Sequence, residues 1–131
     1  MEDAQRMTKL DEAKNFLEEA LREFEKGVKE NNITLVRDAG EKAWGAVVQA
    51  TNDLFERRGL PIPTTHRERR EYLEKLEEVD PIVREKGLTD RFMARDHVLH
   101  ERCFYEGYCN IDELRREFEK VKRYIEDIEE L

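Results

Sequence analysis

The amino-acid sequence predicts an all-α protein: an up-and-down bundle of four long helices with a short fifth helix. Apolar residues recur every three or four positions through four long segments, which is the spacing of one buried helix face. No segment shows a convincing alternation of apolar and polar residues, as a half-buried strand would. At 131 residues the length is that of one domain, and we expect residues 1–131 to share a single core.

The first two expected helices each combine an apolar stripe with a charged outer face. The first covers residues 8–29 and ends at the polar turn "KENN". The second covers residues 33–58, where Gly40 and Gly45 lower the helix propensity and are expected to let another helix approach closely. The stripes consist of Leu10, Ala13, Leu17, Ala20, Leu21, Phe24 and Val28, and of Val36, Ala39, Ala43, Val47, Ala50 and Leu54.

A loop with one glycine and two prolines, "RGLPIPTT", separates the second helix from a short one. Thr65 and Glu68 form a capping-box pattern at the start of this short helix. A connection, "VDPIVREKGLTD", follows and is expected to hold one helical turn after Pro81. The residues of the short helix that we expect to face inward are Leu73, Leu76 and Val79.

Two further long helices complete the predicted bundle. One is expected over residues 90–105, with Thr89 as its cap and Gly107 near its end. The last begins with Asn110 and Glu113 as a capping pair. Its apolar positions keep the spacing of a heptad seam: Leu114, Phe118, Val121, Ile125 and Ile128.

Charge and composition restrict the classes of partner. With 24 basic and 32 acidic residues, the net charge of -8 opposes non-specific binding to DNA, RNA or anionic membranes, and we expect neither a DNA nor a membrane partner. The N-terminal stretch "MEDAQRMTKLDEAK" lacks the apolar region of a signal peptide, so we expect a cytoplasmic protein. Cys103 and Cys109 are too few for a disulfide framework, and reduced thiols are expected. Abundant Glu, Lys and Arg are typical of thermophiles.

The candidate catalytic residues lie in "RDHVLHERCFYEG", residues 95–107. Asp96 and His100 are four residues apart on one helix face, so the carboxylate can orient the imidazole or raise its pKa. Arg95 can neutralise phosphoryl oxygens while His100 moves a proton, which suits a phosphodiester. In a chain with 43% charged residues, the same pattern is also typical of a solvated helix face, and both interpretations stay open.

Four more residues are candidates for ligand binding: His66, His97, Tyr105 and Lys42. His66 follows the Thr65 cap and lies either in an exposed first turn or in a groove. The Tyr105 hydroxyl is expected to be free to reach a polar partner. Three-residue spacing of His97, His100 and Cys103 is compatible with metal ligands, but no C-x-x-C pair is present, and we expect no metal and no cofactor.

Three stretches together resemble the HEPN superfamily over roughly residues 10–130. The segment "RDAGEKAWGAVVQATNDLFERRGLPIPTTHRERREYLEKL" is similar to its second and third helices. "RDHVLH" resembles its motif of arginine, a polar residue, three more residues and histidine, and "LHERCFYEG" is similar to the archaeal PaREP branch. The matching residues of the first segment are Gly40, Glu41, Lys42, Ala43, Ala46, Gly59, Pro63, Thr65 and His66.

The resemblance implies a four- or five-helix bundle that pairs as a homodimer. Many members of the superfamily are metal-independent endoribonucleases, and the resemblance to them implies that Arg95 and His100 are the catalytic pair, with Asp96 at the variable polar position. Other members are non-catalytic partners of small nucleotidyltransferases, and the resemblance to them implies such a role for this chain. The sequence departs from the pattern two residues beyond His100, where Arg102 replaces an aromatic residue.

Two functions are therefore expected, and the sequence alone does not choose between them. The first, which the net charge favours, is an accessory module that binds a nucleotide or a partner protein, such as a nucleotidyltransferase or an antitoxin. The second is a toxin-like endoribonuclease that cleaves RNA through a 2',3'-cyclic phosphate, with His100 moving the proton and Arg95 stabilising the charged phosphorane.

Overall fold

All secondary structure in the computed structural model, which describes residues 7–131, is helical, so the predicted all-α class is confirmed. The prediction that the N-terminal stretch is not a signal peptide falls partly on residues 1–6, which lie outside the described residues. The helices are α1 (Lys9–Lys29), α2 (Ile33–Arg57), α3 (His66–Val79), α4 (Pro81–Lys86), α5 (Leu88–Arg95), the π-helix η2 (Asp96–Tyr105) and α6 (Ile111–Glu129).

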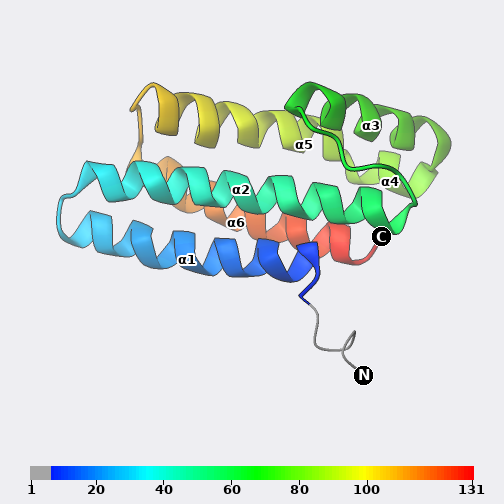
Figure 1. Ribbon diagram of the computed structural model, residues 1–131. Coiled ribbons are helices and arrows are strands. Elements are labelled where there is room, and N and C mark those ends of the chain that lie inside the picture. Colours follow the sequence, from blue (N-terminus) through cyan, green and yellow to red (C-terminus); the bar gives the residue numbers. More distant parts are fainter. Residues whose placement is uncertain (1–6) are drawn as a thin grey trace.

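Four long helical rods run lengthwise through the molecule (Figure 1). They are α1, α2, α5 continued by η2, and α6, and successive rods point in opposite directions, as predicted for an up-and-down bundle. The short helices α3 and α4 lie at the end of the bundle where α2 ends and the chain has its C-terminus. Within residues 7–131 no helix is long and apolar enough to cross a membrane.

Helix starts follow the predicted caps with one exception. The side chain of Thr65 accepts a hydrogen bond from the Glu68 amide at 3.0 Å, and that of Asn110 accepts one from the Glu113 amide at 2.8 Å. The predicted Thr89 cap is wrong. Gly87, with a left-handed φ of 62°, ends α4 and begins α5 two residues earlier, because glycine adopts this conformation without steric cost.

The core consists of the predicted stripes, with errors at their edges. All five residues of the expected heptad seam in α6 are buried. Leu21, which we expected in the stripe of α1, is 40% exposed because it lies at the edge of that stripe. Val79 was predicted to face inward and is 77% exposed; it is the last residue of α3, where the chain turns away through the Asp80 cap into α4.

Of the two glycines in α2, only Gly40 allows a close approach. A Cβ atom at Gly40 would lie 3.1 Å from the Cys103 Sγ atom of η2, which is closer than side chains normally pack. At Gly45 a Cβ atom would lie 3.5 Å from the Phe16 ring, which is an ordinary contact. The close packing of η2 on α2 therefore depends on Gly40.

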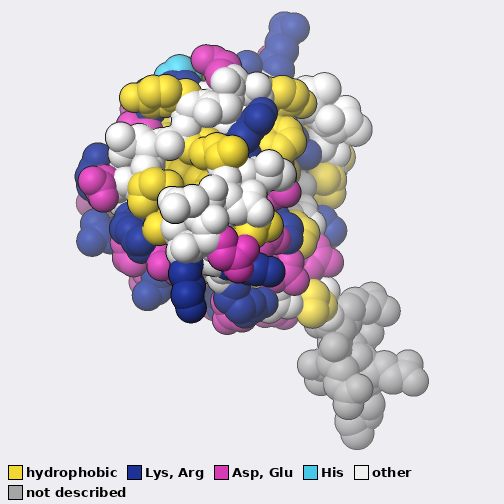
Figure 2. All heavy atoms as spheres, turned by 90° about the vertical axis from the view of Figure 1, so that its left-hand side faces the viewer, with side chains coloured by type: hydrophobic (Ala, Val, Ile, Leu, Met, Phe, Trp, Pro, Cys, Tyr) yellow, Lys and Arg dark blue, Asp and Glu magenta, His cyan; other side chains and the backbone are white. Residues whose placement is uncertain are grey.

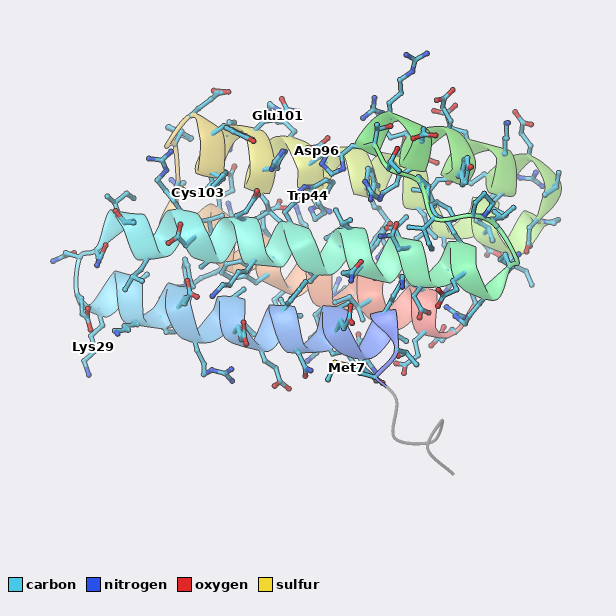
Figure 3. All side chains as sticks on the ribbon, in the orientation of Figure 1. Met7, Lys29, Trp44, Asp96, Glu101 and Cys103 are labelled. Atoms are coloured by element: carbon cyan, nitrogen blue, oxygen red, sulfur yellow. A yellow bond between two sulfur atoms is a disulfide. The ribbon has the colours of Figure 1, made fainter. Side chains whose placement is uncertain are left out.

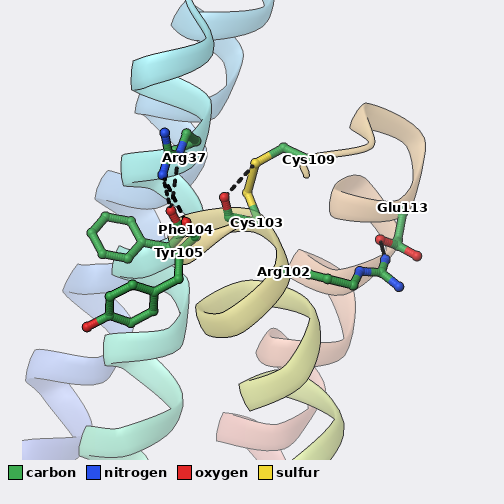
Figure 4. The surroundings of a disulfide bond; sticks show 7 residues. All are labelled: Arg37, Arg102, Cys103, Phe104, Tyr105, Cys109 and Glu113. Carbon is green, nitrogen blue, oxygen red and sulfur yellow. Dashed lines mark hydrogen bonds and ion pairs between the residues drawn. A yellow bond between two sulfur atoms is a disulfide. The ribbon is translucent and has the colours of Figure 1, made fainter. Parts of the chain in front are cut away.

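A disulfide bond joins Cys103 to Cys109, so the expectation of reduced thiols is wrong (Figure 4). The chain reverses through Gly107, whose φ is 78°, and this turn brings the two Cα atoms within 4.5 Å. A second contact fixes the end of η2: the Arg37 guanidinium of α2 donates to the Phe104 carbonyl oxygen. The segment that carries Phe104 and Tyr105 is thus anchored both to α2 and to the start of α6.

Candidate functional site

The helix that carries the predicted motif changes its geometry within that motif. It is α-helical up to Arg95 and a π-helix from Asp96 to Tyr105, so the single α-helix expected over residues 90–105 is wrong in this respect. A π-helix has i→i+5 hydrogen bonds and wider turns; it is rare, and it frequently occurs at functional sites. The change alters which side chains share a face, and it begins between the two first residues of the motif.

Arg95 points away from the rest of its motif. Its side chain is buried between α5 and α6, with the residue 6% exposed. The Nε and Nη2 atoms donate to the two carboxylate oxygens of Glu117, at 2.5 Å and 3.2 Å. This two-pronged ion pair is the preferred geometry between arginine and a carboxylate, and it neutralises the Arg95 charge.

His100 is oriented by a residue that the sequence reasoning did not select. Its Nδ1 atom lies 2.8 Å from a carboxylate oxygen of Glu41 in α2. Glu41 therefore orients the His100 ring, a role that we expected of Asp96. The ring stacks on Trp44 with centroids 5.7 Å apart, and the Tyr105 ring packs edge-on at 4.8 Å. Because a carboxylate only accepts hydrogen bonds, Nδ1 carries the proton and Nε2 of the neutral ring is an acceptor.

His66 has the opposite tautomer. Its Nδ1 atom lies 3.0 Å from Nη1 of Arg69, and a guanidinium can only donate, so Nδ1 accepts and Nε2 carries the proton. Arg69 is itself fixed by Asn52, whose side-chain oxygen accepts at 2.9 Å, and by the Pro63 carbonyl oxygen. Burial, followed by the nearby Arg69 charge, lowers the pKa of His66.

Asp96 is a buried carboxyl group with an unused oxygen. The residue is 9% exposed, and its Oδ1 atom has no hydrogen-bond partner among residues 7–131. Burial raises the pKa of Asp96, while the neighbouring His66 and His100 lower it less strongly. An unpaired buried acceptor costs free energy, and a hydrogen bond from a ligand would remove that cost. Because Oδ1 is closed off from solvent, a ligand reaches it only when neighbouring side chains of the cluster move aside.

Together these residues form what we call the histidine cluster: His66, Asp96 and His100, with the Trp44 and Tyr105 rings. The two imidazole centroids are 5.5 Å apart, and the Trp44 ring contacts both imidazoles. Trp44 and Asp96 come from the facing elements α2 and η2 (Figure 3). The cluster offers one N–H donor from His66, acceptors from His100 and Asp96, and an aromatic wall.

The other predicted site residues lie elsewhere. The His97 side chain is 58% exposed, and its only close acidic neighbour is Glu101 at 3.9 Å in the described part of the chain. Lys42 pairs with Glu23 of α1 and lines a hollow of about 480 Å³ between Phe16 and Phe104. Hence His66, Asp96, His100 and Tyr105 are brought together, whereas Arg95, His97 and Lys42 are not.

Three contributing residues were not selected as site residues from the sequence: Glu41, Trp44 and Arg69. A signal existed for each. Glu41 and Trp44 are three residues apart and therefore share a face of α2, and Arg69 lies three residues after His66 on α3. No three His, Cys, Asp or Glu side chains within residues 7–131 converge as metal ligands.

Comparison with known proteins identifies the family. Neither the curated proteins nor the solved structures include a match to this chain. The model of the archaeal PaREP1/PaREP8 family matches residues 8–125. This range contains the whole histidine cluster and all of the helices except the last residues of α6. The chain therefore belongs to the archaeal PaREP1/PaREP8 family.

Proposed function

We propose that this protein is a non-catalytic binding module that takes a nucleotide at the histidine cluster and acts as a homodimer. The observation that carries the proposal is the burial of Arg95 against Glu117. Cleavage of a phosphodiester needs a positive group that faces the developing charge on the phosphoryl oxygens. If Arg95 turned out of its pocket, the buried Glu117 carboxylate would keep only the exposed Lys120 ammonium, 3.4 Å away, as its partner. Breaking a buried ion pair costs up to about 3–5 kcal/mol.

The chemistry of the cluster supports a nucleotide base as the ligand. A base presents N–H donors and ring-nitrogen or carbonyl acceptors along one edge, together with flat faces. Asp96 Oδ1 and His100 Nε2 match donors of that edge, and His66 Nε2–H matches an acceptor. The Tyr105 ring is 67% exposed and offers a surface on which a base can stack.

A binding experiment with nucleosides, which carry no phosphate, tests this recognition directly. We expect calorimetry to show saturable binding of at least one of the four common nucleosides to the wild-type chain. Asp96→Asn replaces one of the two carboxylate acceptors with an NH2 donor and should weaken that binding. The control is His97→Gln, on the same helix but outside the cluster, which should bind as the wild type does. Equal affinities of the Asp96→Asn and His97→Gln variants would refute the proposal, as would four nucleosides without binding.

The homodimer is supported by an apolar end of the bundle. Figure 2 looks onto the end formed by the α1–α2 turn and the η2–α6 connection, and hydrophobic side chains gather at its centre inside a ring of charged ones. Exposed residues of these segments include Ile33 and Tyr108. Exposed apolar patches rimmed by charge are typical of protein interfaces. Light scattering should give about twice the monomer mass of 15.7 kDa, and an Ile33→Glu variant should give a monomer.

An endoribonuclease is the second candidate, and the pair of histidine tautomers favours it. His100 Nε2 can take a proton from a 2'-hydroxyl, and His66 Nε2–H can give one to the leaving oxygen. Arg70 lies close enough to lower the pKa of Asp96 and would have to supply the positive charge that Arg95 does not. RNA incubated in a chelator should then yield 2',3'-cyclic phosphate ends with the wild type and none with His100→Ala. Absence of such ends with the wild type excludes this function.

A partner protein, such as a nucleotidyltransferase or an antitoxin, is a further proposed ligand of the module. Reproducible co-purification from the native source would support it. If neither the wild type nor the Ile33→Glu variant ever co-purifies with a partner, the proposal of a protein ligand is contradicted.

A further inference from the structure

A second hollow of the molecule is lined only by basic side chains. It lies between α5 and α6, has a volume of about 400 Å³, and its lining residues are Arg91, Arg95, Lys120 and Arg123. We call it the basic hollow. Arg95 reaches it from the side of the helix that faces Glu117 of α6, whereas Asp96 belongs to the histidine cluster, next to α3. Four cations around one hollow are unexpected in a chain with a net charge of -8.

The positive charge of the basic hollow exceeds the carboxylates that contact it. Glu117 pairs with Arg95 and lies 3.4 Å from the Lys120 ammonium group, and Asp127 pairs with Arg91 at 2.8 Å. Four positive charges against two negative ones leave two positive charges. Arg123 forms no ion pair with any residue from 7 to 131, so its charge is not compensated by these carboxylates.

Two of the three arginines of the basic hollow, Arg91 and Arg95, are fixed before any ligand binds. The Arg91 guanidinium is held by Asp127 and the Lys86 carbonyl oxygen, and it lies over the Tyr124 ring at 5.5 Å. The Arg95 fork donates to Glu117 through Nε and Nη2, and its Nη1 atom makes no hydrogen bond to the described residues. Side chains that are already ordered lose little entropy when a ligand binds, which favours affinity.

We propose that the basic hollow binds a small phosphate-bearing ligand the size of a diphosphate group, at a site separate from the histidine cluster. Arginine and lysine around a shared space match phosphate oxygens in both charge and hydrogen-bond geometry. The two uncompensated charges offset most of the negative charge of one compact diphosphate group. A long polynucleotide is disfavoured because it would extend over a surface whose total charge is negative.

Calorimetric titration of the full chain with sodium diphosphate tests the proposal. The test variant is Lys120→Gln/Arg123→Gln, which removes two exposed charges and leaves the Arg95–Glu117 and Arg91–Asp127 ion pairs intact. The matched control is Arg116→Gln/Lys122→Gln, which removes the same charge from other exposed positions of α6. We expect saturable binding to the wild type, a loss of affinity of about ten-fold or more in the test variant, and no loss in the control. Circular dichroism melting confirms that both variants fold.

Three results would overturn the proposal. The first is no saturable binding of diphosphate to the wild type. The second is an equal loss of affinity in the test variant and the control, since that reflects total charge and not a site. The third is a short RNA that binds more tightly than diphosphate and is weakened by the test variant, which would make the hollow a contact for a polynucleotide backbone. Nucleoside binding at the histidine cluster is measured without phosphate, so either site can fail independently of the other.

Discussion

Replacement of Glu117 by glutamine should destabilise the fold strongly, because it leaves a buried positive charge without its partner. Both side chains of the Arg95–Glu117 pair are almost fully buried, with 7% and 4% exposed. Breaking such a pair by removing one partner costs about 3–5 kcal/mol. For 131 residues the unfolding entropy is about 0.28 kcal/mol/K, from about 2.1 cal/mol/K per residue. The melting temperature of Glu117→Gln should therefore fall by about 10 to 18 °C.

Thermal denaturation followed by circular dichroism measures this shift, with Glu129→Gln as the matched control. Glu129 pairs with Lys14 at 2.7 Å, but both side chains are nearly half exposed, and exposed pairs contribute about 1 kcal/mol or less. The control should melt within about 4 °C of the wild type. If both variants shift equally little, Arg95 is not committed to the core, and the main argument against catalysis fails.

Three further variants or conditions test other parts of the structure. Gly40→Ala should lower stability by about 1–2 kcal/mol because its Cβ would press on the Cys103 sulfur, whereas Gly45→Ala should raise it by up to about 1 kcal/mol; urea unfolding that ranks them otherwise contradicts the packing of η2 on α2. Reduction of the disulfide, whose cysteines are six residues apart in sequence, should lower the free energy of unfolding by about 2 kcal/mol in the same assay. An unchanged urea midpoint would be incompatible with the bond. Because burial raises the pKa of Asp96, the wild type loses stability as the pH rises from 3.8, the ordinary value, through the raised pKa. Asp96→Asn should therefore be more stable than the wild type at pH 7, with a difference that shrinks in acid; a less stable variant at pH 7 would refute the burial cost.

The helices could be predicted from the sequence because their signals are local. The apolar spacing of α6 and the caps Thr65 and Asn110 each depend on residues within a few positions of one another. Errors occurred where a neighbouring element decides the outcome. Thr89 follows a glycine whose left-handed conformation starts α5 before the threonine could cap it, and Val79 ends α3 where the chain turns.

The site was only partly predictable because its contacts join distant segments. The motif contains Asp96 and His100, which the structure brings together, but the partner of His100 lies 59 residues away, at Glu41, and that of Arg95 lies 22 residues away, at Glu117. The onset of the π-helix at Asp96 has no local sequence signal that we recognise. Spacing along a single helix does not reveal which way a side chain points. It also does not reveal that Glu41, and not Asp96, is the carboxylate that pairs with His100.

The central claim is that the histidine cluster binds the ligand, and NMR of the imidazole groups tests it most directly. The chain has three histidines, two within the cluster and His97 outside it. On titration with the nucleoside that binds, the imidazole signals of His66 and His100 should shift together and saturate, while those of His97 stay in place. Signals of His66 and His100 that do not move at saturating nucleoside, or that move no more than those of His97, would contradict the account.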